Sequence, residues 1–484
     1  MDDPYAPARD ALDGDGLAGG AGDGSDGDGG SDGDGDARDD AGSDPAVLAA
    51  RLDDADPLSA FADRYRVPDG VLYMDGNSLG PASDAALASL DRVVDEWRDR
   101  LIAGWTDADP PWFSVGERLG DALAPLVGAD SAEVAVGNSI TVNVHTLVGT
   151  FLDELLASNG PEREGMARAD GEWDRSVEPA VLVNELDFPS DHYAIRAQLR
   201  GRGIDPDEKL RVVESRDGRT IDPRDVEAAL AAHDDIGIVF MPTALYRSGQ
   251  LFDVERITEA AHEAGAYAGF DAAHSAGAVP HQFDAAGVDF AVWCTYKYLN
   301  AGPGAVGALF VAARHHGLTP ALAGWWGHEK ATQFEMNMTY TPADSAGAWQ
   351  IGTPPLLSAA PLEGSVELLR EAGIDRLRAK SLALTDFLIA LVDDRLPEVA
   401  VGTPREHASR GGHVALEHPD AERLSAALND RGVVVDFRPP NVVRVCPAAP
   451  YTSFADVLAV VDEIEAILES GAHEAYATGE GGVT

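Results

Sequence analysis

The chain has 484 residues and a net charge of −47 at neutral pH, from 83 acidic and 36 basic residues. Nucleic acids and anionic membranes bind basic patches, so this charge balance argues against both as partners. Hydrophobic residues make up 45% of the sequence, which is typical of a folded protein with a large core and more than one domain.

The excess of acidic residues indicates an unusual solvent. At about 1 M salt the screening length falls to about 3 Å, and the self-repulsion of an acidic surface largely vanishes. Lysine is also rare, because Lys209, Lys297, Lys330 and Lys380 are the four lysines of the chain. These features favour a high-salt cytoplasm such as that of halophilic archaea, with a GC-rich acidic mesophile as the alternative.

Nothing in the sequence indicates export. Met1 is followed by two aspartates in place of a basic segment and an apolar core. No apolar run approaches the length needed to cross a bilayer. Cys294 and Cys446 are the two cysteines, too few for a disulfide framework. We therefore expect a soluble, cytoplasmic protein.

The chain begins with an acidic segment, residues 1–45, that is rich in glycine and aspartate. Its few large apolar residues predict a disordered tail. Residues 46–75 follow with a short helical pattern and a strand, and we expect this N-terminal segment to pack with the second domain.

From residue 76 to 355, short β-rich runs alternate with helical patterns. The predicted strands cover 133–136, 180–183, 210–213, 237–241, 267–270 and 288–296, with a seventh that ends at Val311. Such alternation predicts an α/β domain in which helices cover both faces of a mainly parallel, seven-stranded sheet.

Residues 356–475 predict a second, smaller domain. A long helical pattern comes first, and strands at 413–416, 433–435 and 442–445 then alternate with helices near 420–431 and at the end. This order is that of a compact α+β unit. The last residues, 476–484, are expected to form a flexible tail.

Lys297 stands out because its surroundings are apolar. It follows the run Val288–Tyr296, whereas the other three lysines lie among charged or polar residues. Apolar surroundings destabilise the ammonium and favour the nucleophilic amine that Schiff-base chemistry requires. The following Gly302-Pro303-Gly304 resembles the start of a dinucleotide motif, but a strand comes next instead of a helix, so we expect a hairpin turn.

Asp271 and His274 follow the predicted strand 267–270, upstream of Lys297. In open α/β sheets, ligands gather at such strand ends. An aspartate there can pair with a pyridinium nitrogen and keep it protonated, although aspartate is also a common helix N-cap. The presence of Lys297 favours the cofactor role.

Three further segments carry candidate binding residues. Gly137–Asn143 lies between a strand and a helix, where it would bind a phosphate or simply cap the helix. Phe188–Tyr193 offers an aromatic ring that would stack on a cofactor or pack as a buried staple. Arg444 lies in an apolar strand, where it would bind a carboxylate or phosphate or form a structural salt bridge. We find neither a metal-ligand spacing nor the G-x-S-x-G elbow of a hydrolase.

Together these segments resemble the kynureninases, pyridoxal-phosphate enzymes of fold type I in the class V aminotransferase superfamily. The resemblance covers nearly the whole chain after the acidic tail. It rests most on residues 288–302, which contain Tyr296-Lys297-Tyr298, and further on residues 73–81, 143–145, 188–191, 269–277, 324–329 and 444–445.

The resemblance implies pyridoxal 5'-phosphate as the cofactor. Lys297 would carry it as a Schiff base, Asp271 would pair with its ring nitrogen, and Phe188 would stack on its ring. The other residues expected around the cofactor and its phosphate are Ile140, Thr141, Pro189, Ser190, Asp191, His274 and Tyr296.

The resemblance also implies a homodimer and an amino-acid substrate. Trp325 and Thr353 would reach the neighbouring subunit's phosphate, and Arg444 would hold the α-carboxylate of the substrate. The sequence departs from the family at two of these positions, since Thr353 stands where some relatives carry asparagine and Pro242 where many carry serine or threonine. Pro242 would thus lack a side-chain hydrogen bond to the cofactor.

The implied reaction is the hydrolysis of L-kynurenine or 3-hydroxykynurenine to L-alanine and anthranilate or 3-hydroxyanthranilate. Lys297 would move the Cα proton, and Tyr296 would protonate the fragment that becomes alanine. An aminotransferase is an alternative because Lys297 and Asp271 would serve it equally, and a catalytically silent binding protein is another. A cysteine desulfurase needs a reactive cysteine on a mobile loop, whereas both cysteines fall on predicted strands.

Overall fold

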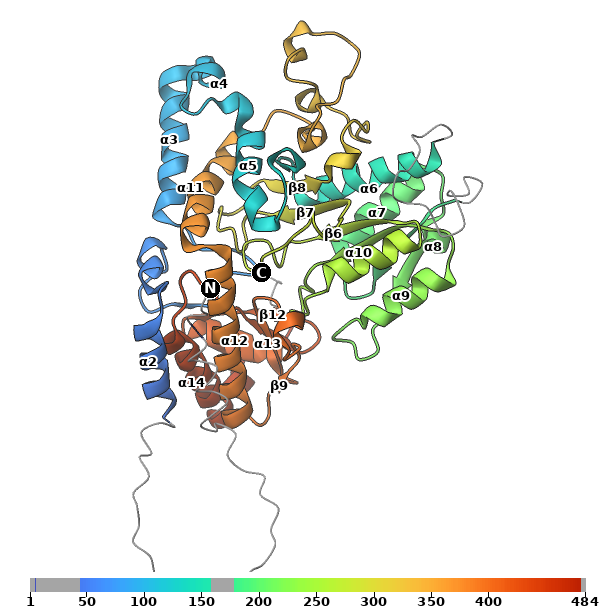
Figure 1. The fold of residues 1–484 in the computed structure, drawn as a ribbon. Helices are drawn as coiled ribbons and strands as arrows, with labels where there is room; N and C mark the ends of the chain where they lie inside the picture. The colour runs from blue at the N-terminus through green and yellow to red at the C-terminus, as the bar shows by residue number, and fades with distance from the viewer. Residues whose placement is uncertain (1–4, 6–43, 158–177, 480–484) are drawn as a thin grey trace, which may run out of the picture.

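A computed structural model describes Tyr5, residues 44–157 and residues 178–479. A seven-stranded sheet lies at the centre of its larger part (Figure 1). The order is β2-β8-β7-β6-β5-β3-β4, and among these described strands β8 alone runs against the others. The strands are β2 (Val134–Val136), β3 (Ala180–Asn184), β4 (Leu210–Val213), β5 (Ile236–Pro242), β6 (Tyr267–Asp271), β7 (Phe290–Cys294) and β8 (Gly307–Val311). The predicted α/β fold is confirmed, as is the hairpin that joins the two strands around Lys297.

Alternate residues of these strands belong to two cores on the two faces of the sheet. Val181 and Phe240 pack into one core, and their neighbours Leu182 and Met241 pack into the other. Because helices cover both faces, the strands are apolar throughout instead of alternating with polar residues. The first core takes in α6 (Ile140–Leu156) and α7 (Pro189–Gly201), and the second takes in α5 (Val115–Val127), α9 (Pro223–Ala232) and α10 (Val254–Glu263).

A smaller part follows the order that the sequence predicts. Its four-stranded antiparallel sheet has the order β12-β13-β10-β9. The predicted strand 433–435 corresponds to β11, while β12, which begins at residue 436, and the two-residue β9 are additions. The elements are α12 (Ile374–Arg395), β9 (Ala400–Val401), β10 (Val414–Glu417), α13 (Ala421–Asp430), β11 (Val433–Val434), β12 (Asp436–Arg438), β13 (Val442–Val445) and α14 (Phe454–Ser470).

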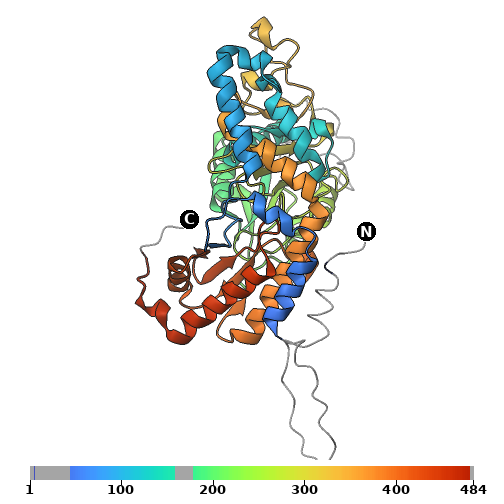
Figure 2. The same ribbon diagram turned by 90° about the vertical axis from the view of Figure 1, so that its left-hand side faces the viewer.

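The N-terminal segment packs with this smaller part (Figure 2). Helix α2 (Pro45–Ala55) places Asp53 at the start of α14, where its carboxylate accepts hydrogen bonds from the backbone N–H groups of Phe454 at 2.7 Å and Ala455 at 3.0 Å. These are among the donors that a helix leaves unsatisfied at its N-terminus. Strand β1 (Leu72–Tyr73) then pairs in parallel with β11. These contacts fix the position of residues 45–73 on the smaller part before the chain continues into the large part.

Helices α3 (Asp84–Arg100) and α11 (Leu356–Ala372) pack closely side by side along the large part (Figures 1 and 2). A Cβ atom at Gly364 would lie 2.2 Å from the backbone oxygen of Ala85, so only glycine permits this approach. Leu362 and Val366 of α11 belong to the core beneath the large sheet. The domain boundary that we place at residue 355 stays a prediction, and α11, which begins directly after it, packs against the large part.

The structure differs from the predicted disordered tail at Tyr5. This side chain is 3% exposed, packs in the core of the smaller part, and donates a hydrogen bond from its hydroxyl to the carboxylate of Asp56. Burial of an aromatic ring outweighs the polar composition of its surroundings at this point. The rest of the predicted tail lies outside the described residues.

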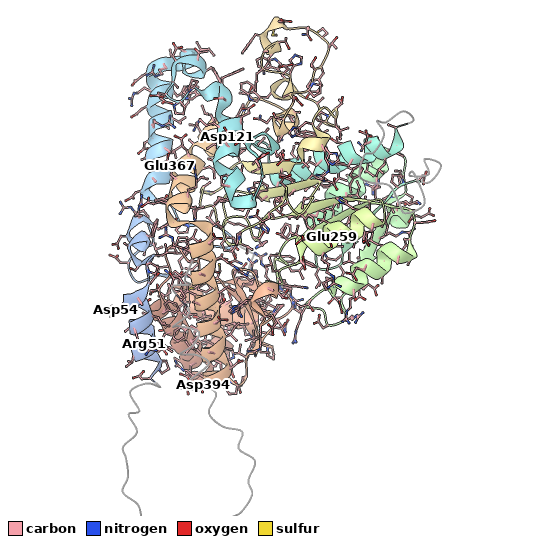
Figure 3. All side chains as sticks on the ribbon, in the orientation of Figure 1. Arg51, Asp54, Asp121, Glu259, Glu367 and Asp394 are labelled. Atoms are coloured by element: carbon pink, nitrogen blue, oxygen red, sulfur yellow. The ribbon has the colours of Figure 1, made fainter. Side chains whose placement is uncertain are left out.

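Charged side chains lie on the outer faces of the helices. The exposed residues Arg51, Asp54, Asp121, Glu259, Glu367 and Asp394 mark this surface in Figure 3. Within the described ranges, no helix has both the length and the apolar composition to span a membrane.

Candidate active site

A cavity of about 530 Å³ opens at the carboxyl ends of the central strands and is closed on one side by the small sheet. Its volume is in the range of small-molecule sites. Nine of the residues that line it are ones that the sequence predicts, and the others were not predicted. The predicted ones are Ile140, Thr141, Phe188, Ser190, Asp271, His274, Tyr296, Lys297 and Arg444.

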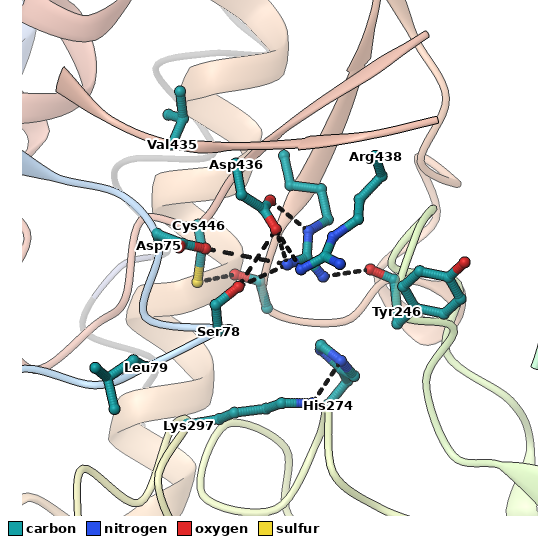
Figure 4. Close-up of polar contacts among 12 residues, drawn as sticks. Asp75, Ser78, Leu79, Tyr246, His274, Lys297, Val435, Asp436, Arg438 and Cys446 are labelled. Atoms are coloured by element: carbon teal, nitrogen blue, oxygen red, sulfur yellow. Dashed lines mark hydrogen bonds and ion pairs between the residues drawn. The ribbon is translucent and has the colours of Figure 1, made fainter. Parts of the chain in front are cut away.

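Lys297 lies in the loop after β7 and points into this cavity (Figure 4). Its Nζ is 2.7 Å from Nε2 of His274. Burial lowers the pKa of the lysine amine, although the neighbouring Cys294 and Asp271 act in the opposite direction. The environment thus favours the unprotonated, nucleophilic form that we expect from the sequence.

The segment after β1 holds the lysine loop from the other side. The backbone N–H of Gly80 donates to the oxygen of Tyr296 at 2.7 Å, and that of Asn300 donates to the oxygen of Lys297 at 2.9 Å. A Cβ atom at Gly80 would lie 2.0 Å from Oδ1 of Asn300 and 2.5 Å from the oxygen of Lys297. Glycine is therefore required at this position for the two segments to approach.

Asp271, at the end of β6, forms a buried pair with Asp191 of α7. Its Oδ1 accepts a hydrogen bond from the N–H of Ala273 at 2.8 Å. Burial raises the pKa of both carboxyls, and the charge of Asp271 raises that of Asp191 further, while Lys297 partly opposes the change at Asp271. We expect one proton to be shared by this pair, with the charge on Asp271, because like charges in one buried site do not both ionise.

His274 is a neutral imidazole in this setting. Burial lowers its pKa well below the usual value, and the positive charges of Lys297 and Arg444 lower it further. Its Nε2 faces Lys297, and in the described part of the chain its Nδ1 has no hydrogen-bond partner. A neutral ring can exchange a hydrogen bond with the lysine without adding positive charge.

Two helices begin at the opposite wall of the cavity. Ile140 and Thr141 are the first residues of α6, and Ser190 is the second residue of α7. Helix N-termini carry free N–H groups and a positive partial charge, which suit a phosphate. Phe188 lies at the start of α7 with its ring 46% exposed, where it can cover a planar ligand.

Arg444 of β13 is engaged by protein acceptors. Its Nε donates to Oδ1 of Asp436 at 2.6 Å, and one terminal nitrogen also bonds to the second oxygen of that carboxylate. The other terminal nitrogen donates to the backbone oxygen of Tyr246 at 2.7 Å. Arg444 therefore forms a structural salt bridge and also lines the cavity, so both predicted alternatives are observed.

Five lining residues were not assigned by the sequence: Asn77, Ser78, Tyr246, Ala273 and Arg438. Asn77 and Ser78 lie within one of the segments that carry the resemblance, but nothing local to them indicates a role. Arg438 stands beside two prolines in a polar stretch, which reads as a surface loop. Ala273 lies between Asp271 and His274 in the sequence. The contacts of Asn77, Ser78 and Tyr246 with Arg444 are long-range, so only the folded chain reveals them.

Comparisons with known proteins identify the family. A profile of the kynureninase C-terminal domain matches residues 377–464. Kynureninase from Geobacillus thermodenitrificans is 45% identical over 430 residues, which cover 88% of this chain and 95% of that protein. The chain belongs to the kynureninase family. Kynureninase from Bacillus anthracis is 43% identical, with the same shares of the two chains covered.

The family that the motifs indicate is therefore confirmed. These kynureninases come from Geobacillus and Bacillus, and they do not support the halophilic-archaeal type that we expected from the composition.

Solved structures confirm the fold-type I architecture. A cysteine desulfurase from Thermococcus onnurineus superposes with a TM-score of 0.68 at 18% identity, over 85% of this chain and 98% of that one. A cysteine desulfurase from Escherichia coli gives 0.67 at 15% identity, over the same shares. At such identities the likeness concerns the fold alone. Cys294 and Cys446 are both buried in this chain, and neither lines the cavity that we describe.

Several predicted residues lie outside the wall of the kynureninase cavity. Pro189 is the first residue of α7, and Asp191 lies behind Asp271. Pro242 pairs with Asp271 across β5 and β6, so it neighbours the site through its backbone. Trp325 is 46% exposed and Thr353 is exposed, and in this single chain neither faces the described cavity.

Proposed function

We propose that this chain is a kynureninase, a pyridoxal-phosphate-dependent hydrolase of carbon–carbon bonds. It cleaves the Cβ–Cγ bond of L-kynurenine or 3-hydroxykynurenine and releases L-alanine with anthranilate or 3-hydroxyanthranilate. The observation that carries the proposal is the contact of 2.7 Å between Lys297 and His274 in a cavity lined by Asp271, found in a chain of this family.

The residues present fit the cofactor. Lys297 would bind it covalently, Asp271 would face its ring nitrogen, and Phe188 would cover its ring. The starts of α6 and α7, at Thr141 and Ser190, would hold its phosphate. When bound, the cofactor supplies an electron sink for the negative charge that develops on the substrate.

The proton steps fall to residues that are already positioned. Lys297, whose pKa is lowered by burial, accepts the proton from Cα of the substrate as a neutral amine. His274 orients this amine through its Nε2. Burial raises the pKa of Tyr296 above its usual value, so its phenol keeps its proton at neutral pH and can donate it to the three-carbon fragment. Asp271 would remain charged and would keep the ring nitrogen of the cofactor protonated.

We also propose a homodimer in which each subunit completes the other's site. Trp325 and Thr353 are exposed and do not line the cavity of their own chain, and apolar side chains are exposed on the same chain. A continuous exposed apolar patch on a folded protein often marks a protein–protein interface. The surface includes an apolar groove of about 350 Å³ and the exposed residues Trp97, Leu101, Ile102, Leu357, Phe334, Met336 and Met338. We expect this surface to be buried between two copies of the chain, with Trp325 and Thr353 near the partner's phosphate.

A cytoplasm rich in salt is the setting that we propose. It is supported by the net charge of −47 and by the scarcity of lysine. A high concentration of ions screens the repulsion between the many acidic side chains on the surface.

The proposed function is tested with the protein loaded with pyridoxal phosphate in high salt. We expect visible absorption from the lysine-bound cofactor, and release of L-alanine with anthranilate from L-kynurenine. Lys297→Ala should lose both signals, whereas Lys209→Ala, directly before the edge strand β4, should keep them. Transfer of the amino group to a keto acid, with no anthranilate or 3-hydroxyanthranilate formed, would instead establish an aminotransferase.

A further inference from the structure

His274 presents one ring nitrogen to Lys297 and turns the other away from it (Figure 4). Nε2 lies 2.7 Å from Nζ of the lysine, whereas Nδ1 has no hydrogen-bond partner among the described residues. The side chain belongs to a residue that is 8% exposed, and a buried polar atom without a partner is rare in a folded protein. A partner that Nδ1 takes up during catalysis is therefore to be sought around this ring.

A second buried histidine, His413, packs against the ring of His274. The centres of the two imidazoles lie 6.0 Å apart, and their planes are inclined at 61°. His413 is 0% exposed, and no side chain in the described ranges bonds to its ring nitrogens. It directly precedes β10 of the small sheet, so the large part and the smaller part each supply one imidazole to this pair.

The backbone around His413 is held on two sides. The N–H of Gly411 donates to the oxygen of Gly249, in the loop after β5, at 2.7 Å. A Cβ atom at Gly249 would lie 2.7 Å from the backbone oxygen of His413, and one at Gly412 would lie 2.8 Å from the hydroxyl oxygen of Tyr298. The glycines thus allow this segment to pack directly against the lysine loop. His413 itself does not line the described cavity, so it acts on a ligand only through another residue.

The surroundings of His413 keep its imidazole neutral. Burial lowers the pKa of this ring to about 3, and the positive charges of Arg444 and Lys297 lower it as well. Asp436 and the backbone of Arg247 act in the opposite direction and do not offset burial. A neutral imidazole has one N–H donor and one nitrogen that accepts. At neutral pH this ring can therefore offer an acceptor to the imidazole that faces it.

Such an acceptor determines the tautomer of His274. Which nitrogen of a histidine carries the proton is set by the hydrogen bond that the other nitrogen makes. With the proton on Nδ1 and an acceptor beside it, Nε2 keeps its lone pair for the lysine. Hydrogen bonds that act in catalysis often shorten only when the substrate is bound, so the separation of the two rings suits a bond that forms in the loaded site.

We propose that His413 is a positioning residue, which accepts a hydrogen bond from Nδ1 of His274 and so keeps Nε2 as the acceptor for an N–H of Lys297. The amine of the lysine is then held through its hydrogen, and its lone pair is left for the proton on Cα of the substrate. The proposal rests on the proposed function for the part that Lys297 plays, but not for the tautomer of His274.

The test compares two substitutions of His413 in the cofactor-loaded enzyme with L-alanine bound. His413→Phe keeps a buried ring and loses the acceptor, whereas His413→Gln keeps an acceptor. The matched control is His473→Phe, because His473 forms a similar edge-on pair with His418, with ring centres 5.8 Å apart, away from the cavity. The tautomer is read from NMR of protein labelled at its histidine nitrogens, with signals assigned by His274→Gln. Melting temperature, kcat and KM for L-kynurenine complete the set.

We expect the parent protein and His413→Gln to carry the proton of His274 on Nδ1, and His413→Phe to shift it toward Nε2. In His413→Phe, kcat should fall about 10- to 100-fold, because misplacing a group that moves protons costs up to about 100-fold, and KM should change little. His413→Gln should recover most of the lost kcat. His473→Phe should match the parent protein in tautomer and in kcat.

A His413→Phe protein with the tautomer or the kcat of the parent would overturn the proposal, as would a parent protein with the proton on Nε2. Equal losses in His413→Phe and His413→Gln would also overturn it, because the shape of the imidazole would then be what matters. If His413→Phe does not fold, His413→Leu, which also lacks an acceptor, takes its place. The NMR measurement does not need kynurenine as the substrate, so failure of the proposed function would be seen separately.

Discussion

Lys380 and Asp56 form an ion pair inside the smaller part, with Nζ of the lysine 2.7 Å from Oδ2 of the aspartate and 2% of either side chain exposed. The pair joins α12 to the segment after α2, and the hydroxyl of Tyr5 donates to the same carboxylate. The backbone N–H of Leu58 donates to this carboxylate as well, at 2.8 Å.

Removing one partner of this pair should be costly. Lys380→Met leaves the buried charge of Asp56 without its counterion, and we expect the free energy of unfolding to fall by about 3–5 kcal/mol. Chemical denaturation in high salt measures this change. Arg98→Met removes an exposed ion pair and should stay within about 0.5 kcal/mol of the parent protein; a similar loss in both variants would contradict the argument.

Gly80→Ala should disturb the lysine loop. The new Cβ atom would press on Asn300 and on the oxygen of Lys297, so we expect a loss of stability of about 1–3 kcal/mol and a lower kcat. Gly201→Ala is the matched control, because a Cβ atom there has nothing within 4 Å. The melting temperature and the rate of anthranilate release distinguish the two, and a Gly80→Ala variant with normal values would show that the loop moves freely.

The two buried carboxyls should differ in their effect on catalysis. Asp271→Asn removes the charge that faces the ring nitrogen, and we expect kcat to fall by about 100-fold or more. Asp191→Asn replaces the carboxyl that already holds the shared proton, so kcat should change much less. Steady-state kinetics of both variants show which substitution lowers kcat more. A larger loss in Asp191→Asn than in Asp271→Asn would exchange the two roles.

The buried His281 should make stability depend on pH. Burial, with a contribution from Arg378, lowers its pKa to about 4, whereas in the unfolded chain it titrates near its usual value. The unfolded state therefore gains a proton first as the pH falls from about 6.5 to 4, and we expect a loss of about 3 kcal/mol over this window. His281→Gln, in which the amide can still bond to Ser275, should lose this part of the pH dependence of the free energy of unfolding. His233→Gln, at an exposed site, should keep it. Equal slopes in the parent and His281→Gln proteins would refute this assignment.

Salt should stabilise the folded chain. Because the net charge is −47, raising KCl from about 0.1 M to about 1 M should increase the melting temperature by shortening the screening length from about 10 Å to about 3 Å. Sucrose at equal osmolality is the control for general exclusion from the surface. A melting temperature that does not respond to KCl would contradict the proposed high-salt setting.

The central sheet could be predicted because each of its buried strands is a short, continuous apolar run. Lys297, Asp271 and His274 could be predicted as well, since they follow such strands directly in the sequence. Asn77 and Ser78 could not, because their common partner Arg444 lies far along the chain; Ser78 meets Arg444 across 366 positions.

Lys380 shows a different limit. In the sequence it lies among charged residues, Arg376 and Arg378, but the helix turns it onto the same face as Leu377 and Leu384, which are buried. The helical period of 3.6 residues was the signal for this placement, and reading only adjacent residues missed it.

The bond between Ser78 and Arg444 has a consequence for synthesis of the chain. The wall that surrounds Lys297 draws on residues near both ends of the described sequence, so a ribosome has to deliver almost the entire polypeptide before the pocket exists. A growing chain that stops before β13 would carry its reactive lysine with no enclosure to capture the cofactor. The visible absorption of the lysine-bound cofactor is therefore a marker that the whole chain has folded, and truncated fragments should remain colourless.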